Sequence, residues 1–85
     1  MDEEWSVYIV KCSDNTLYCG ATNNIEKRIK LHNSGKGAKY TKNRNPVQLV
    51  ASRGGMTKSQ ALSLEYKVKK QKRKDKIAYL LGYNM

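Results

Sequence analysis

Two short stretches that are rich in apolar side chains, typical of β-strands, lie within the first 22 residues of the chain. Segments 5–12 (WSVYIVKC) and 16–22 (TLYCGAT) are rich in β-branched and aromatic residues, and the residues between them, Ser13-Asp14-Asn15, are typical of a turn. A three-residue loop fixes the register of this predicted hairpin, because side chains alternate between the two faces of a strand. One face then carries Val7, Ile9, Leu17, Cys19 and Ala21, and the other carries Tyr8, Val10, Cys12, Tyr18 and Gly20.

A helical period follows the hairpin. Asn23 or Asn24 can cap a helix that runs to about Asn33, and Gly35 is a stop signal just beyond it. The next segment, 34–44 (SGKGAKYTKNR), has no apolar period and is predicted to be a mobile basic loop.

The predicted helix carries two rows of side chains, one apolar and one polar. Ile25 and Ile29 form the inward apolar stripe. Arg28 and His32 are four residues apart, so their side chains project together beside that stripe.

The second half of the chain predicts one more strand and two helices. Residues 47–52 (VQLVAS) look like a third strand that stops at Gly54-Gly55. Residues 57–60 have capping-box spacing and open a helix, whose lysine-rich continuation, 67–76, is predicted to stay helical. Ala61, Leu64 and Val68 form its apolar face, and Ile77, Leu80 and Leu81 supply the buried side of a last short helix. We therefore expect a single α+β domain over residues 1–85, with a three-stranded antiparallel sheet and the order β-β-α-β-α-α.

Glu65 is the most informative acidic residue. It lies inside the apolar stripe of the second predicted helix. A carboxylate in such a place is costly unless a cation or a metal ion is its partner.

Composition and charge restrict the class of partner. The chain has 17 Lys and Arg against 7 Asp and Glu, a net charge of +10 on 85 residues, which favours a polyanion. Nucleic acid is the first candidate, with DNA preferred and RNA as the other possibility. A membrane is not expected, because no apolar run approaches the roughly 20 residues that span a bilayer and the start is acidic rather than signal-like. We expect a cytoplasmic monomer.

Cys12 and Cys19 are expected to be buried free thiols. A zinc site needs about four ligands, and the chain has only one His to add. The predicted register also places the two cysteines on opposite faces of the hairpin.

The order of these features, with Tyr8, Tyr18-Cys19-Gly20, Arg28, His32, Tyr40 and Glu65, resembles the GIY-YIG nuclease family over nearly the whole chain. The strings LYCG (17–20) and HNSGKGAKYT (32–41) are similar to those of the small stand-alone bacterial members. Ser6-Val7-Tyr8 stands where the family has Gly-Ile-Tyr, and Cys19 replaces the Ile of Tyr-Ile-Gly, so both tyrosines are retained.

The resemblance implies a metal-dependent endonuclease. Because no segment resembles a recognition helix, we expect it to select DNA by shape rather than by sequence. Glu65 would hold a Mg²⁺ or Mn²⁺ ion largely through waters, and Arg28 would bind the phosphoryl oxygens. Tyr8 and Tyr18 would order the attacking water, with either a tyrosine or His32 as general base. Contacts to the nucleic-acid backbone are expected from the basic loop, through Lys36, Lys39, Tyr40, Lys42 and Arg44.

Two other functions compete with this one. The same fold and basic surface could serve a nucleic-acid-binding module that cuts poorly or not at all. The chain could also be a structural subunit whose charge meets ribosomal RNA or an acidic protein. An inward Glu65 favours the enzyme, because a pure binding module does not need that carboxylate.

Overall fold

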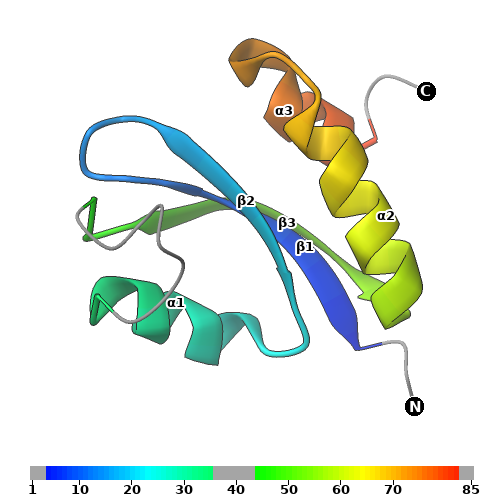
Figure 1. The fold of residues 1–85 in the computed structure, drawn as a ribbon, viewed down its shortest axis with the longest axis horizontal. Helices are drawn as coiled ribbons and strands as arrows, with labels where there is room; N and C mark the ends of the chain where they lie inside the picture. The colour runs from blue at the N-terminus through cyan, green and yellow to red at the C-terminus, as the bar shows by residue number, and fades with distance from the viewer. Residues whose placement is uncertain (1–3, 36–43, 83–85) are drawn as a thin grey trace.

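The structure, a computed structural model, describes residues 4–35 and 44–82 of the 85-residue chain. The elements follow in the order strand, strand, helix, strand, helix, helix, which confirms the predicted order and the α+β class. Their bounds are Trp5–Lys11 (β1), Leu17–Thr22 (β2), Ile25–Asn33 (α1), Gln48–Met56 (β3), Lys58–Lys69 (α2) and Arg73–Leu80 (α3). The three strands form one antiparallel sheet in the spatial order β2-β1-β3 (Figure 1).

The hairpin of β1 and β2 has the predicted register. The facing pairs are Val7 with Ala21, Tyr8 with Gly20, Ile9 with Cys19, Val10 with Tyr18 and Lys11 with Leu17. Tyr8 and Tyr18 therefore lie on the same face, with 6.5 Å between their ring centroids. Cys12 and Cys19 are buried on opposite faces, in different apolar clusters.

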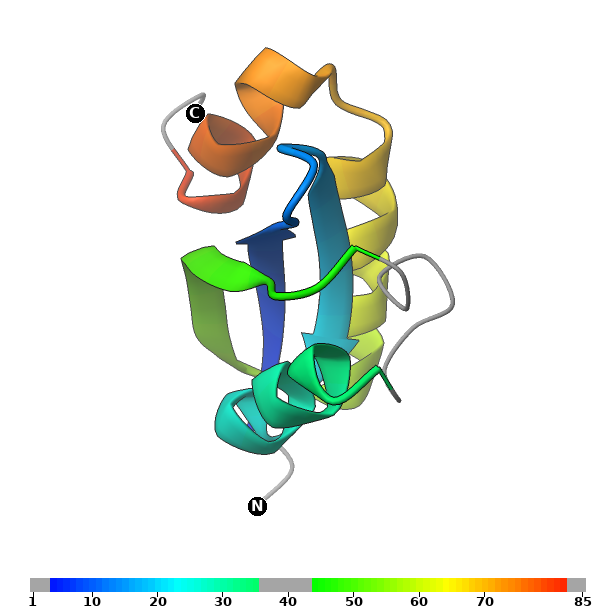
Figure 2. The same cartoon turned by 90° about the vertical axis from the view of Figure 1, so that its left-hand side faces the viewer.

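The sheet is covered on both faces, with α1 on one side and α2 and α3 on the other (Figures 1 and 2). On the α1 side, Ile25 and Ile29 pack against a buried cluster of Tyr8, Val10, Cys12 and Val47. On the other side, the buried cluster consists of Val7, Ile9, Cys19, Ala51, Ala61, Val68 and Leu80. The face of the sheet that carries Tyr8 and Tyr18, called the tyrosine face below, is thus covered by α1, the helix that carries Arg28 and His32.

Both predicted helix starts are confirmed. The side chain of Asn24 caps α1 by accepting a hydrogen bond from the backbone N–H of Lys27. Thr57 and Gln60 form a reciprocal capping box at the start of α2, with hydrogen bonds of 3.0 and 3.1 Å. Gly35, just after α1, has a φ of +79°, as a helix stop signal requires. Within the described ranges, every helix is too short or too polar to cross a membrane.

The third strand is longer than predicted. The sequence predicts its end at Gly54-Gly55, whereas β3 continues to Met56, which pairs with Trp5. The register of β1 against β3 shifts between Trp5 and Val7, and Gly55 has a φ of +76°. These features describe a β-bulge, a place where glycine supplies a backbone conformation that other residues rarely adopt. The prediction was wrong because glycine can either end a strand or bend it.

The lysine-rich stretch 67–76 is not one helix, so the prediction that it stays helical was wrong. Helix α2 ends at Lys69 and α3 begins at Arg73. The ammonium of Lys76 donates to the carbonyls of Val68, Lys69 and Gln71, at 3.3, 3.0 and 2.9 Å. It thereby adds a side-chain donor to backbone carbonyls in and just after the last turn of α2, where the regular helical pattern of hydrogen bonds ends. The break lets α3 fold back, which buries its last residue in the apolar cluster under α2.

Candidate active site

A buried phenol is the centre of the tyrosine face. Tyr8 is fully buried, and its hydroxyl oxygen is 2.9 Å from Nε2 of His32 and 3.3 Å from Nε of Arg28. The guanidinium Nε always carries a proton, so it donates to the phenol oxygen. We assign the phenol proton to the bond with Nε2 of His32, which makes His32 a neutral imidazole protonated on Nδ1.

Tyr18 completes this cluster from the edge strand β2. Its ring centroid is 6.5 Å from that of Tyr8 and 5.5 Å from that of His32. The hydrogen bond with Tyr8 is the main reason why the pKa of Arg28 is raised, and the interaction with Tyr18 raises it further. The structure thus brings four of the five predicted catalytic side chains into one group, from β1, β2 and α1.

Gly20 lets this group assemble. It pairs with Tyr8 across the hairpin, and the phenol ring lies directly over it. A Cβ atom at position 20 would lie 2.5 Å from the Tyr8 hydroxyl oxygen and 2.7 Å from Cζ, closer than side chains tolerate. No role was expected for Gly20 from the sequence, although a glycine in the string Tyr18-Cys19-Gly20 indicates a place where a side chain would not fit.

Burial sets the protonation of the two central groups. It raises the pKa of Tyr8 above the usual 10.0, and the hydrogen bond from Arg28 opposes this change. It lowers the pKa of His32 below 6.5, and the positive charge of Arg28 adds to the effect. Both groups are therefore neutral at physiological pH, which agrees with the proton assignment above.

The neutral state of His32 predicts a loss of stability in mild acid. Its pKa is 6.5 when unfolded and lower when folded, so folding favours the neutral form. The contribution is present above pH 6.5 and is lost as pH falls toward the folded pKa, by up to about 1.4 kcal/mol per pH unit. We expect the urea midpoint of unfolding to fall between pH 7 and pH 5.

His32→Gln is the control for this titration, because it removes the only histidine of the chain. Its urea midpoint should depend much less on pH over the same interval. A wild-type midpoint that stays constant from pH 7 to pH 5, or an equal slope in His32→Gln, would contradict the assignment.

Glu65, the fifth predicted residue, comes from α2 on the other side of the sheet. Its side chain is 18% exposed, and its charge is one of the causes that raise the pKa of Tyr8. Its carboxylate oxygen Oε2 is 2.8 Å from Nζ of Lys69, one helical turn later. Within the described part of the chain, the ion-pair partner of Glu65 is Lys69 and not Arg28.

Lys69 is the residue of this region that sequence reasoning missed. The lysine-rich stretch 67–76 was given no part in the site, yet Nζ of Lys69 lies 5.6 Å from the centroid of the Tyr18 ring and 2.8 Å from Oε2 of Glu65. The hydrogen bond with Glu65 is the main reason why the pKa of Lys69 is raised. The spacing of four residues between Glu65 and Lys69 was the available signal.

The donor chemistry at Glu65 suits a hydrated Mg²⁺ or Mn²⁺ ion. Among residues 4–35 and 44–82, three or more His, Cys, Asp or Glu side chains nowhere gather closely enough to hold a metal together. Mg²⁺ retains several waters and needs only one or two protein carboxylates. A single, partly exposed carboxylate beside phenol groups meets that requirement.

Most of the predicted basic loop lies outside the described residues, including Lys36, Lys39, Tyr40 and Lys42. Arg44 is described. Its Nε is 3.0 Å from Oδ2 of Asp14, and its carbonyl accepts a hydrogen bond from the backbone N–H of Ser13. The structure therefore places the end of the loop against the turn of the hairpin.

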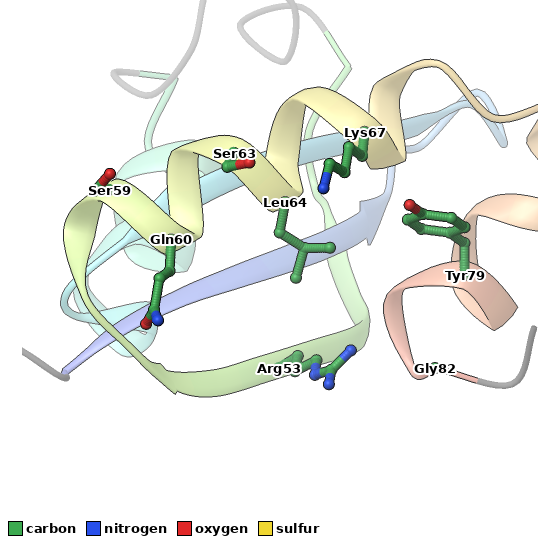
Figure 3. A pocket seen from close by; sticks show the side chains of 8 residues that line it. All are labelled: Arg53, Ser59, Gln60, Ser63, Leu64, Lys67, Tyr79 and Gly82. Carbon is green, nitrogen blue, oxygen red and sulfur yellow. The ribbon is translucent and has the colours of Figure 1, made fainter. Parts of the chain in front are cut away.

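A pocket of about 500 Å³ lies elsewhere, between α2, β3 and the end of α3 (Figure 3). Its lining residues are Arg53, Ser59, Gln60, Ser63, Leu64, Lys67, Tyr79 and Gly82. It contains none of the five predicted catalytic residues. The tyrosine group lies instead on the opposite face of the sheet, toward α1.

Comparison with known proteins gives close relatives of similar size. The chain is 52% identical over 73 residues to the UPF0213 protein YazA of Bacillus subtilis, a match that covers 86% of this chain and 74% of the relative. It is 55% identical over 71 residues to the UPF0213 protein SH2523 of Staphylococcus haemolyticus, which covers 84% and 87%.

Two solved structures share the fold, and both were determined by solution NMR. The protein EF2693 of E. faecalis is 37% identical with a TM-score of 0.61, over 93% of this chain and 84% of that one. The UPF0213 protein BH0048 of Bacillus halodurans is 46% identical with a TM-score of 0.53, over 85% and 77%.

The family comparison covers the whole candidate site. Residues 4–78 match the model of the GIY-YIG catalytic domain, a range that includes both tyrosines, Arg28, His32 and Glu65. Since this match spans most of the 85 residues, the chain belongs to the GIY-YIG nuclease family.

Proposed function

We propose that this protein is a metal-dependent endonuclease that hydrolyses phosphodiester bonds in DNA of particular shape. The observation that carries the proposal is the buried hydroxyl of Tyr8, held between Nε of Arg28 and Nε2 of His32. A proton acceptor next to a permanent cation is what attack on a phosphodiester needs, because a proton must leave the water while negative charge builds on the phosphoryl oxygens.

Tyr8 and His32 act as one base in this proposal. The raised pKa of Tyr8 makes an isolated phenolate scarce at neutral pH. Neutral His32 removes this difficulty, because the Tyr8 oxygen takes a proton from the attacking water while the phenol proton moves to Nε2 of His32. Each donor loses one proton and each acceptor gains one. Tyr18, 6.5 Å from Tyr8 between ring centroids, helps to order the water.

Arg28 binds the phosphoryl oxygens. Its guanidinium is planar, permanently charged and carries five N–H donors, more than its bond to Tyr8 uses. That bond also fixes the orientation of the guanidinium before the substrate arrives. A pre-oriented cation stabilises developing charge without reorganising during the reaction.

Glu65 is the residue that would hold the Mg²⁺ or Mn²⁺ ion. When bound, such an ion neutralises charge on the phosphate and the leaving oxygen. Glu65 is suited to this task because it is an oxygen ligand on a regular helix and its charge acts on Tyr8. Its ion-pair partner is Lys69 rather than Arg28.

Substrate selection is proposed to depend on backbone shape. The net charge of +10 supports contacts to phosphates, and such contacts carry no direct sequence information. The residues that we expect to provide them are Lys36, Lys39, Tyr40, Lys42 and Arg44. Affinity should therefore depend steeply on salt, with a loss of about tenfold or more between 50 and 200 mM.

The function is tested by incubating the purified protein with supercoiled, linear duplex, branched and single-stranded DNA, each with Mn²⁺ and with a chelator. We expect cleavage in Mn²⁺ only, with the branched substrate cut faster than linear duplex. Salt-sensitive binding without cleavage on any substrate would reject the nuclease and favour the binding module. Tight binding that ignores salt would reject substrate selection through phosphate contacts and indicate a specificity element.

A further inference from the structure

Lys69 contacts two members of the candidate site at once. On α2 its ammonium is 2.8 Å from Oε2 of Glu65, and it lies 5.6 Å from the ring centroid of Tyr18 on β2. The lysine side chain is 49% exposed, whereas that of Glu65 is only 18% exposed. A cation that can reach solvent therefore covers a carboxylate that is mostly enclosed.

This pair differs from an ordinary ion pair on a helix surface. Exposed pairs of this spacing are weak and are easily replaced by water. Here the enclosed carboxylate has few competing waters, and the ring of Tyr18 supplies a second attraction for the ammonium. Lys69 is therefore held at the side of Glu65 that faces the tyrosine.

A divalent cation at Glu65 would lie close to the ammonium of Lys69, because both oxygens of Glu65 belong to one carboxylate. An ammonium 2.8 Å from Oε2 and a metal ion at the same carboxylate repel each other. The two cations therefore compete for Glu65, and this contact distinguishes Lys69 from other lysines nearby. Lys70, for example, lies 4.4 Å from the ring centroid of Tyr66, a side chain that is 62% exposed.

We propose that Lys69 is a positioning residue that occupies Glu65 as a built-in counter-ion until a divalent metal ion displaces it. The inference rests on the proposed function, since it assumes that Glu65 is the metal ligand. Lys69 keeps the carboxylate neutralised and in place without metal, at the expense of metal affinity. Removal of its charge should strengthen metal binding.

The test is a titration of the protein with Mg²⁺ in the absence of DNA, followed by NMR at the backbone amides around Glu65. Lys69→Met should bind Mg²⁺ roughly threefold to tenfold more tightly than the wild type, because one competing ion pair is gone. Lys69→Arg keeps the competitor and should bind Mg²⁺ no more tightly than the wild type. Lys70→Met removes the same charge from the residue directly after α2 and should change the affinity by less than about twofold.

Three results would overturn the proposal. These are an unchanged affinity in Lys69→Met, an equal gain in Lys70→Met, which would indicate net charge alone, and the absence of Mg²⁺ binding near Glu65 in every variant. Glu65→Gln should abolish the local response and so assigns it to this carboxylate.

The proposed function can fail separately. Wild-type cleavage in Mn²⁺ with an unchanged Mg²⁺ affinity in Lys69→Met would reject the role of Lys69 alone. A tighter Mg²⁺ site in Lys69→Met with no cleavage of any DNA would support Lys69 as the counter-ion and reject the nuclease.

Discussion

Glu65→Gln should lower the rate of metal-dependent DNA cleavage by about 10³-fold or more and change DNA affinity by less than about threefold. An active-site metal ion contributes several kcal/mol to transition-state stabilisation, and each 1.4 kcal/mol is a factor of about ten. Gln keeps the size of the side chain but is a poor ligand for a hard cation. DNA affinity is set mainly by cations that meet phosphates, and Glu65 is not one of them. Single-turnover cleavage and a binding titration in chelator separate the two effects.

Glu26→Gln is the matched control. Glu26 is exposed in the first turn of α1, so the same chemical change there should leave cleavage nearly unaffected. Cleavage by Glu65→Gln at close to the wild-type rate would remove Glu65 from the mechanism. Cleavage and binding that fall together would instead indicate that Glu65 supports the fold or the DNA surface.

The tyrosine half of this site was predictable because local rules determine it. A three-residue turn and the two-residue period of a strand place Tyr8 and Tyr18 on one face, and the structure has this register. The spacing of four residues puts Arg28 and His32 on one side of a helix. Neither rule predicts the hydrogen bond between Tyr8 and His32, because this bond depends on how α1 packs against the sheet through Ile25 and Ile29.

The Glu65 half depended on long-range packing. An inward Glu65 was evident from its apolar neighbours, but its partner was not. Lys69 looked like one member of a lysine run, and only the approach of α2 to the edge strand β2 places it beside Tyr18. The bulge at Gly54-Gly55 was missed for the same reason, because it depends on pairing with Trp5, far away along the chain. The break after α2 was missed because it depends on capping by Lys76 from the next helix.

The roles of these residues came from the family resemblance rather than from their spacing. Two tyrosines on one face and a buried histidine are compatible with a packed core. The order of the motifs along the chain identified the nuclease family, and residues 4–78 match its catalytic domain. The geometry adds how the side chains are connected, which makes each role separately testable.

Gly20→Ala should reduce the rate of DNA cleavage by about 10²-fold, although it adds one methyl group and removes no functional side chain. The new Cβ would lie 2.5 Å from the Tyr8 hydroxyl oxygen and 3.0 Å from its Cε1 atom. Tyr8 is fully buried, so its ring must shift and lengthen the hydrogen bonds to His32 and Arg28. A misplacement of about 1 Å is enough for a loss of this size. Overpacking should also destabilise the domain by roughly 1–3 kcal/mol, measured by urea unfolding.

Two further variants separate the position of the phenol from general damage to the sheet. Gly54→Ala adds the same methyl group elsewhere in the sheet, where its Cβ would lie 2.9 Å from Oγ of Ser6, a terminal atom that can rotate away, and it should keep most of the cleavage rate and lose less stability than Gly20→Ala. Tyr8→Phe removes the hydroxyl itself. If Gly20 acts through that hydroxyl, the double variant with Gly20→Ala should cut little more slowly than Tyr8→Phe alone, because the two changes disable one unit. Fully additive losses, or near wild-type cleavage by Gly20→Ala, would show that Gly20 does not act through the Tyr8 hydroxyl, and near wild-type cleavage by Tyr8→Phe would remove that hydroxyl from the mechanism.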